Sequence, residues 1–299
     1  GNEAVSRGAW EAGVAVASAY PDTPSTEILE NFARFPNVYA EWAPNEKVAV
    51  DAAVGAAYAG RRALAAMKHV GVNVAADSIF YASMTGLEAG LVIISADDPS
   101  MHSSQNEQDN RRYAKFARLP CLEPSDSQEA KNLVAAALDL SEQFDTPVFL
   151  RLTTRLCHSS TPVELGEQQP GPPAQAKFPR NPAKYVMVPN NARKKHPVIE
   201  ARLRRLAEFA EAFPYNRIEW GARNLGIATC GVAYQYAREV FPDASILRLG
   251  MTYPLPAKLV HEFAAGVERL IVIEELDPFL EEEIKLMGID CEGKSIFPI

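Results

Sequence analysis

Short apolar runs alternate with longer amphipathic segments along the first half of the chain. The apolar runs lack the polar alternation of a strand with one face in water, so they predict strands buried on both faces. These strands are expected at 13–19, 38–42, 63–68, 91–95 and 148–152. Helical patterns lie between them at 25–33, 46–60, 74–87, 106–118 and 126–142, and the last opens like a capped helix at Ser125–Glu129. The alternation predicts an α/β domain with a doubly wound parallel sheet.

The pattern breaks after residue 156 and resumes on a smaller scale at Leu225. Between these points, Thr161–Pro173 is rich in Pro, Gly and Gln and predicts a surface connection, which a charged helix follows at about 197–212. Later strands are expected at 225–230, 245–249 and 270–275, with helices at 231–240, 256–264 and 278–287. The sequence therefore predicts a larger α/β domain at 1–165, a linker with a charged helix at 166–222, and a smaller α/β domain at 223–299.

Two features of the second half have open interpretations. The basic run Arg193–His196 is either a solvated face or a contact for an acidic partner. Gly231 follows a strand directly and opens a helix, so it either holds an anion on backbone N–H groups or makes a tight packing turn.

Composition narrows the class of protein. A chain of 299 residues with 47% hydrophobic and 23% charged residues is typical of a globular protein with two cores. The net charge of −8 argues against nucleic-acid binding, which needs a basic face. The cysteines at 121, 157, 230 and 291 form no close pair, which argues against a zinc or iron–sulfur site in this chain and favours a reducing compartment. No apolar run reaches membrane-spanning length, and we expect no membrane contact and a cytoplasmic location.

The most informative acid is Glu46, in the segment Ala43–Gly60. It stands in the first turn of a helix made largely of Ala, Val and Gly, which let another surface approach closely. Such an acid can lie against a flat heterocycle. The alternative is an ordinary first-turn acid, which the helix dipole favours by roughly 0.3–1 kcal/mol.

Three polar segments follow predicted strands, where an open parallel sheet binds its ligands. Tyr20–Glu27 offers the hydroxyl of Thr23 but also fits a helix cap. Met67–Asp77 carries Lys68, His69 and Asn73 around Gly71, although a lone His is usually a satisfied core residue. Ser95–Arg112 is long and polar, and it is either a site loop or a surface loop. In it, His102 is a candidate to lie over a substrate, and Arg111 or Arg112 to clamp a carboxylate. No GxGxxG, Walker, HExxH or GxSxG motif is present, so these residues alone do not define a reaction.

Longer matches do. The matching stretches are Gly1–Ala4, Tyr20–Thr26, Glu41–Lys47, Met67–Gly71, Asn73–Asp77, Ser95–Pro99, Met101–Arg111, Leu249–Leu255 and Val272–Phe279. In these stretches the chain resembles the large (alpha) subunit of the indolepyruvate:ferredoxin oxidoreductases, which belong to the thiamine diphosphate-dependent 2-oxoacid:ferredoxin oxidoreductase family. The matching stretches follow one another in the same order as in that family and extend over essentially the whole chain.

The resemblance implies roles for individual residues. Residues 1–165 are expected to form a pyrimidine-binding (Pyr) domain, and 223–299 a domain like the transketolase C-terminal one. Glu46 matches the glutamate that hydrogen-bonds N1′ of the aminopyrimidine, and is thus the expected catalytic residue. His69 and Asn73 are expected to line the cofactor, and Thr23, His102 and Arg111 the substrate, with Arg112 as an alternative to Arg111. Asp22 stands where the family usually has Gly, and Asp tolerates a positive φ less well than Gly does.

The resemblance also implies cofactors and partners. The expected cofactor is thiamine diphosphate with Mg²⁺, but no pattern for its pyrophosphate half or for the family's [4Fe-4S] clusters lies in these 299 residues. We therefore expect a fragment or a subunit that shares its site with a second chain and dimerises. The expected reaction consumes an aryl 2-oxo acid and coenzyme A and reduces ferredoxin. A non-oxidative thiamine diphosphate enzyme and a non-catalytic structural subunit are the alternatives.

Overall fold

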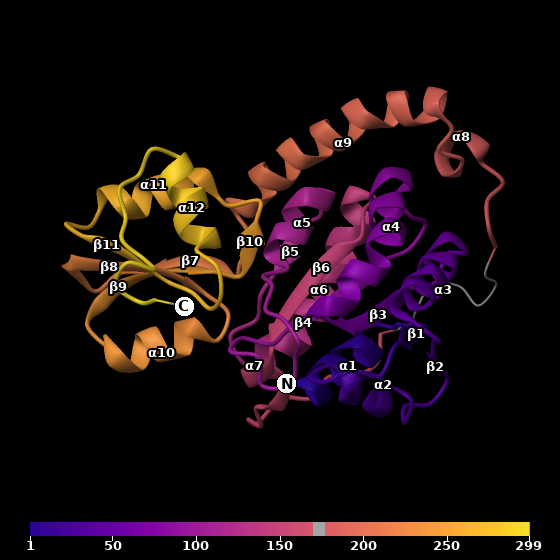
Figure 1. Ribbon diagram of the computed structural model, residues 1–299, viewed down its shortest axis with the longest axis horizontal. Coiled ribbons are helices and arrows are strands. Elements are labelled where there is room, and N and C mark those ends of the chain that lie inside the picture. The colour runs from indigo at the N-terminus through magenta and orange to yellow at the C-terminus, as the bar shows by residue number, and fades with distance from the viewer. Residues whose placement is uncertain (170–176, 299) are drawn as a thin grey trace.

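The chain folds into two α/β domains that lie side by side, joined along one edge by the long helix α9 (Pro189–Ala210) (Figure 1). The computed structural model describes residues 1–169 and 177–298. The strand order is β10-β5-β6-β4-β3-β1-β2 in the larger sheet and β11-β8-β9-β7 in the smaller one. Apart from the pairs β10–β5 and β7–β9, neighbouring strands run parallel. The predicted fold class is therefore confirmed.

The strands of the larger sheet follow the apolar runs of the sequence. They are β1 (Val16–Ala19), β2 (Tyr39–Trp42), β3 (Ala63–Lys68), β4 (Leu91–Asp97), β5 (Cys121–Leu122), β6 (Val148–Thr153) and β10 (Met251–Tyr253). Every residue of β3, β4 and β6 is buried, as expected for strands covered on both faces. The two short strands β5 and β10 were not predicted from the sequence.

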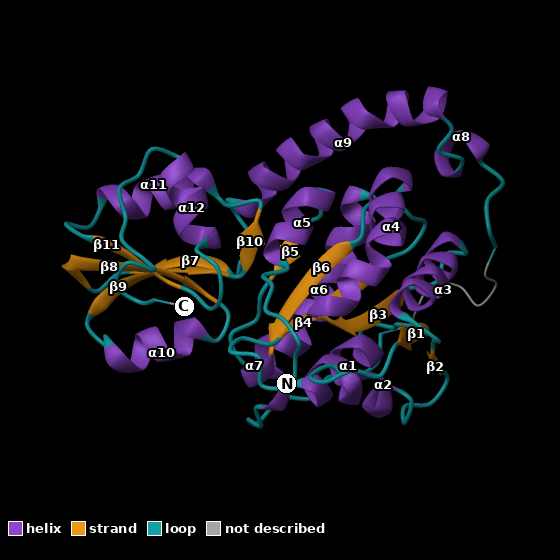
Figure 2. Cartoon of the chain, in the orientation of Figure 1, coloured by secondary structure: helices purple, strands orange, loops and turns teal. Residues whose placement is uncertain are grey.

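Helices cover both faces of the larger sheet (Figure 2). They are α1 (Asn2–Glu11), α2 (Thr26–Phe32), α3 (Glu46–Tyr58), α4 (His69–Thr85), α5 (Arg111–Ala117), α6 (Ser127–Phe144) and α7 (Thr154–His158). One face packs on α1, α2 and α6, and the other on α3, α4 and α5. The predicted cap of α6 is present, since Asp126 accepts a hydrogen bond from the Glu129 amide. α1 was not predicted, and α4 begins at His69, five residues before the predicted start at 74.

The smaller domain begins earlier than the sequence suggested. Its strands are β7 (Asn216–Glu219), β8 (Ala222–Cys230), β9 (Ala244–Leu249) and β11 (Leu270–Ile273). Its helices are α10 (Ala233–Val240), α11 (Ala257–Ala265) and α12 (Phe279–Leu286). The predicted linker at 166–222 is thus wrong at its carboxyl end, because β7 already pairs with β9. The Asn216 side chain fixes this start: Oδ1 accepts from the amides of Gly250 and Met251, both at 2.9 Å.

The linker itself lies against the larger domain. It contains α8 (Pro182–Tyr185) and α9, and the predicted connection at Thr161–Pro173 extends outside the described residues. α9 starts eight residues before the predicted 197. In the basic run, Lys195 donates to the Thr85 carbonyl at 3.1 Å, at the carboxyl end of α4. One residue of this run is therefore a helix cap rather than part of a free basic surface.

Backbone geometry decides two expectations from the sequence, one at Gly231 and one at Asp22. Gly231 has a φ of 55°, and a Cβ built there would lie 3.4 Å from Oε2 of Glu123. A carboxylate beside the turn opposes an anion, which favours the packing-turn interpretation. Asp22 is not among the residues of the described chain that have a positive φ, so it fits its loop without that strain.

Candidate active site

The carboxyl ends of β1, β3 and β4, three neighbouring strands, bring the three polar loops together. Lys68, the last residue of β3, is the point where they meet. Its Nζ donates to the Ser103 carbonyl of the third loop at 2.8 Å and lies 3.6 Å from Oδ1 of Asp22 in the first loop. The side chain is only 2% exposed. The predicted convergence of the loops is therefore present in the structure.

The third loop is tied to the first turns of α4. His69 Nε2 lies 3.1 Å from the Asn106 carbonyl, and the side chain of Asn73 donates to Oε1 of Gln108 at 3.0 Å. Tyr113 donates to Oδ1 of Asn73 at 2.6 Å. His69 is fully buried, and its Nδ1 has no hydrogen-bond partner among the described residues. The two residues expected to line a cofactor thus belong to one network with the loop.

Asp98 holds the beginning of the same loop. Its carboxylate accepts hydrogen bonds from the Ser103 amide at 2.8 Å, the Thr154 hydroxyl at 2.7 Å and the Ser104 hydroxyl. Burial opposes the charge, but these hydrogen bonds outweigh it and lower the pKa of Asp98 to about 2. The loop is therefore folded around a carboxylate that stays ionised at neutral pH.

Glu46 stands at the edge of this convergence, in the first turn of α3. Asn45 caps the helix by accepting from the Val48 amide at 3.0 Å, so the backbone there is satisfied without Glu46. The Glu46 residue is 6% exposed and packs on Gly71 of α4. Its carboxylate has no hydrogen-bond or ion-pair partner among the described residues. The carboxylate of this largely buried residue is therefore available to a ligand at the edge of the loops.

Thr23 and His102 lie on the open side of the loops. Both are exposed in the described chain, as are the nearby apolar side chains of Tyr20, Trp42 and Met101. An open edge with exposed aromatic groups is typical of a surface that a further domain or chain covers. The structure brings Glu46, His69 and Asn73 around the start of α4, whereas Thr23 and His102 are exposed residues of the first and third loops.

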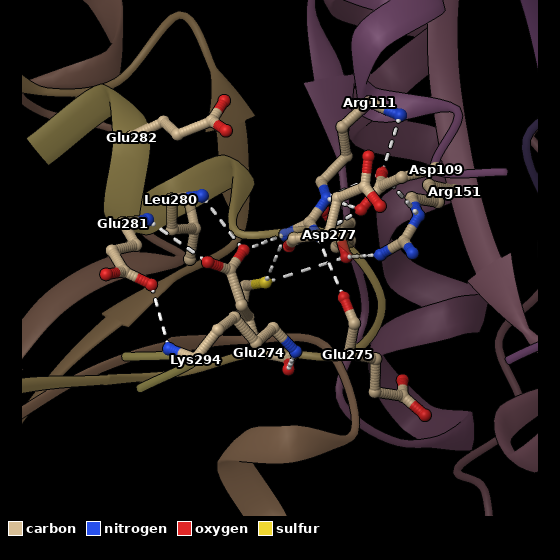
Figure 3. Close-up of polar contacts among 12 residues, drawn as sticks. Asp109, Arg111, Arg151, Glu274, Glu275, Asp277, Leu280, Glu281, Glu282 and Lys294 are labelled. Carbon is tan, nitrogen blue, oxygen red and sulfur yellow. Dashed lines mark hydrogen bonds and ion pairs between the residues drawn. The ribbon is translucent and has the colours of Figure 1, made fainter. Parts of the chain in front are cut away.

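Arg111 is not at this site. It is fully buried between the two domains, where Nε donates to Asp109 at 2.9 Å and Nη1 to Glu274 at 2.7 Å (Figure 3). Nη2 donates to the Glu275 carbonyl at 2.9 Å. Burial opposes the charge, but Asp109, Glu274 and Glu123 raise the pKa of Arg111 well above its usual value. Because all three nitrogens are engaged, the expectation that Arg111 clamps a substrate carboxylate needs correction.

The alternative, Arg112, also faces the smaller domain. Its Nε donates to Asp277 at 2.7 Å and its Nη1 to Glu282 at 3.0 Å, on the exposed side of the junction. Neither arginine therefore supplies a free cation to the loops. The cation that the fold places there is Lys68, whose signal in the sequence is a lysine directly after the apolar run Ala63–Met67.

The described residues, 1–169 and 177–298, offer neither a cluster of metal ligands nor a membrane-spanning helix. They contain no group of three or more His, Cys, Asp or Glu side chains placed to hold a metal ion. No helix in these ranges has the length and apolar character needed to cross a bilayer.

Comparison with known proteins identifies the class. Residues 7–208 match the family model described as pyruvate flavodoxin/ferredoxin oxidoreductase, thiamine diphosphate-binding. The chain belongs to this family of thiamine diphosphate-binding domains.

Individual relatives in sequence define the similarity more closely than the family model. The chain is 43% identical over 300 residues to the indolepyruvate oxidoreductase subunit IorA of Archaeoglobus fulgidus, covering 97% of this chain and 48% of that protein. It is 44% identical over 317 residues to the subunit of the same name from Thermococcus kodakarensis, covering 100% of this chain and 49% of the relative. The chain thus spans about half the length of the curated relatives it matches.

Solved structures agree on the fold. A 2-oxoglutarate:ferredoxin oxidoreductase from Magnetococcus marinus, solved with 2-oxoglutarate, coenzyme A and succinyl-CoA bound, matches with a TM-score of 0.75 at 17% identity, covering 98% of this chain and 60% of that one. A split-gene transketolase, solved as an inactive β4 tetramer, matches with a TM-score of 0.60 at 14% identity, covering 97% and 86%. At these identities the likeness concerns the fold, and both domains of this chain take part in it.

Proposed function

We propose that this chain is the pyrimidine-binding part of a thiamine diphosphate-dependent indolepyruvate:ferredoxin oxidoreductase. The reaction would convert an aryl 2-oxo acid and coenzyme A to the acyl-CoA and CO₂, with two electrons passing singly to ferredoxin. The names of the 43–44% identical relatives support the substrate class. The single observation that carries the assignment is the carboxylate of Glu46, which has no partner among the described residues and belongs to a residue only 6% exposed, beside Gly71.

The residues present fit the pyrimidine half of the cofactor. Glu46 offers a carboxylate with no competing partner in the described chain, Gly71 gives that side chain its place by having none of its own, and His69 has a buried Nδ1 still to be satisfied. When bound, thiamine diphosphate supplies the carbanion-stabilising chemistry of decarboxylation. Glu46 would hold a hydrogen bond at N1′ of the aminopyrimidine and so select its tautomer, as an acid–base group does. His69 and Asn73 would hold the third loop in place beside the pyrimidine ring, through their contacts with Asn106 and Gln108.

The substrate would lie on the open side of the same loops. Thr23 and His102 remain the proposed contacts at the rim, because both are exposed where the loops meet the surface. Lys68 replaces Arg111 as the proposed cation for the substrate carboxylate. All three Arg111 nitrogens are bonded at the domain junction, whereas the Lys68 ammonium donates to the Ser103 carbonyl, lies 3.6 Å from Asp22 and has a further N–H to donate. An ammonium of low exposure gives a stronger charge-assisted hydrogen bond than a solvated one.

Other parts of the reaction would come from outside this chain. We propose that Mg²⁺ and the pyrophosphate group are held elsewhere in the full protein or in a partner subunit, together with the [4Fe-4S] clusters, and that the subunits dimerise. The four cysteines described here are free thiols, three of them buried, as expected in a reducing compartment. We propose a cytoplasmic location, which the free thiols are compatible with.

The test uses the full-length protein with its partner subunit. Glu46→Gln should lower turnover of indolepyruvate by at least about 10²-fold, the usual effect of losing an acid–base group. Asp51→Asn, an exposed carboxylate on the same helix, is the matched control and should keep near-normal turnover. Near-normal activity of Glu46→Gln would contradict the proposal.

Product analysis separates the alternatives. An arylacetaldehyde formed without coenzyme A and ferredoxin would indicate a non-oxidative thiamine diphosphate enzyme. Failure of the assembled protein to bind thiamine diphosphate would indicate a structural subunit.

A further inference from the structure

A buried chain of charges connects the smaller domain to the loop that lies over His69. Arg111 is at its centre, with Asp109 on one side and Glu274 on the other, and all three side chains are at most 1% exposed (Figure 3). Asp109 and Arg111 belong to the larger domain, and Glu274 follows β11 of the smaller one. A contact this dry is insensitive to salt and holds its partners in one geometry.

Glu274 is fixed within its own domain. Its carboxylate accepts hydrogen bonds from the amides of Leu280 at 2.9 Å and Glu281 at 3.1 Å, at the amino end of α12. Burial raises the pKa of Glu274, although Arg111 and these amides oppose the rise. Arg111 is thus anchored to the framework of the smaller domain rather than to a mobile side chain.

A second buried arginine completes the cluster. Arg151 donates from Nε to Asp97 at 2.6 Å and from Nη1 to Glu123 at 2.6 Å, and its Nε lies 3.8 Å from Asp109. Burial is the largest influence on Asp97 and raises its pKa to about 6. The pKa of Asp109 is lowered to about 2, because Arg111 and Arg151 overcome its burial. Both arginines therefore hold Asp109.

The two ends of the third loop are the groups so held. Asp97 ends β4 where the loop begins, and Asp109 precedes α5 where it finishes. The Asn110 amide donates to Asp97 at 3.1 Å and closes the two ends on each other. Between them lie Ser103 and Asn106, whose carbonyls contact Lys68 and His69. The loop that builds the site is therefore clamped at its base by the cluster.

We propose that Arg111 is a positioning residue through which the smaller domain sets the shape of the active-site loop 98–108. It acts on the substrate through the loop and not by contact. The effect on catalysis rests on the proposed function, whereas the effect on the loop does not. A purely structural ion network is the alternative, because breaking one partner of a buried pair also destabilises a protein.

The decisive variant is Glu274→Gln in the full-length protein, which keeps the shape but removes the charge on the far side of the junction. The matched control is Glu282→Gln, since Glu282 pairs with the exposed Arg112 at the same junction. The first readout is amide hydrogen exchange in 98–108, compared with 136–144, the carboxyl-terminal part of α6, whose Ser141 and Glu142 bond to Leu91, Gly90 and Arg62 within the larger domain. The second is KM and kcat for indolepyruvate.

In Glu274→Gln, exchange in 98–108 should accelerate by about 3- to 30-fold, while exchange in 136–144 stays unchanged. KM for indolepyruvate should rise by a similar factor, within the range of coupling energies between sites. The control should stay within about 2-fold of the wild type in both readouts. Loop exchange at the wild-type rate, or acceleration spread evenly over 136–144 and the loop, would overturn the proposal, as would a loosened loop with an unchanged KM. If Glu274→Gln does not fold, Arg111→Lys is the second variant. It keeps the positive charge but loses the guanidinium group that reaches Asp109 and Glu274 together. The same results would support or overturn the proposal.

Discussion

Gly71 lies directly against the side chain of Glu46. A Cβ built on Gly71 would come within 2.6 Å of both Cγ and Oε1 of Glu46, closer than such atoms approach in proteins. The first turn of α4 can therefore reach the first turn of α3 only because residue 71 has no side chain. This contact fixes where the carboxylate stands relative to the three loops.

Replacement of this glycine should displace the carboxylate. Gly71→Ala is expected to lower kcat/KM by about 10-fold or more, because small misplacements of catalytic groups are costly. Gly55→Ala is the control: a Cβ there meets nothing within 4 Å, and the helix should gain about 0.5–1 kcal/mol of stability. Steady-state kinetics and thermal unfolding of both variants check the pair, and equal activity of the two would refute the role of the contact.

Lys68 should affect substrate binding more than turnover. Lys68→Met keeps the length of the side chain but removes the charge proposed to meet the 2-oxo acid carboxylate. KM should rise by about 10- to 100-fold, the equivalent of one hydrogen bond to a charged group, with a smaller change in kcat. Lys47→Met removes an exposed ammonium that pairs with Asp77 at 2.8 Å, and should leave KM unchanged. A wild-type KM in Lys68→Met would remove Lys68 from the site.

Asp98 should make the stability of the loop depend on pH. Its pKa in the folded protein is about 2, below the ordinary 3.8, so the folded state favours the charged form. This contribution is complete above about pH 5 and is lost as the pH falls from about 4 towards 2. Asp98→Asn should therefore be less stable than the wild type by about 1–2 kcal/mol at pH 6, and the difference should shrink below pH 3.

Urea unfolding at pH 6, 4 and 3 measures this difference. Asp77→Asn is the control, since Asp77 is a largely exposed carboxylate in a surface ion pair. A difference between Asp98→Asn and the wild type that does not change with pH would show that the carboxylate is not held in its charged form by the loop.

Asn216 should be important for the stability of the junction. Its side chain accepts from two amides and donates to the Ala210 carbonyl at 2.9 Å, all buried. Asn216→Ala leaves these groups without partners and should destabilise the protein by about 2–4 kcal/mol. Asn224→Ala, at an exposed strand position, should change stability by less than about 0.5 kcal/mol. Chemical denaturation compares the two, and equal stabilities would contradict the bridging role.

The larger domain could be predicted from the sequence because its strands are continuous apolar runs. β3 and β4 are buried throughout and have no competing pattern. α1 could not be predicted because its sequence, Asn2–Glu11, has no side-chain cap and only two large apolar residues, Val5 and Trp10. β7 and β10 have three or four residues each, and their pairing with β9 and β5 depends on contacts distant in sequence.

The site could be predicted only in part. Strand-end loops and a first-turn acid are visible in the sequence, and the fold brings them together around Lys68. Arg111 was misplaced because a basic residue at the end of a polar loop looks the same whether it faces a ligand or another domain. Its partner Glu274 is 163 positions away, a pairing that no local pattern reveals.

The most direct test of the account is the exchange of the C2 proton of bound thiamine diphosphate for deuterium, measured without substrate in the full-length protein. If Glu46 bonds to N1′, Glu46→Gln should slow this exchange by at least about 10²-fold, while Asp51→Asn exchanges at the wild-type rate. Thiamine diphosphate that is bound by Glu46→Gln and exchanges as fast as in the wild type would contradict the central claim.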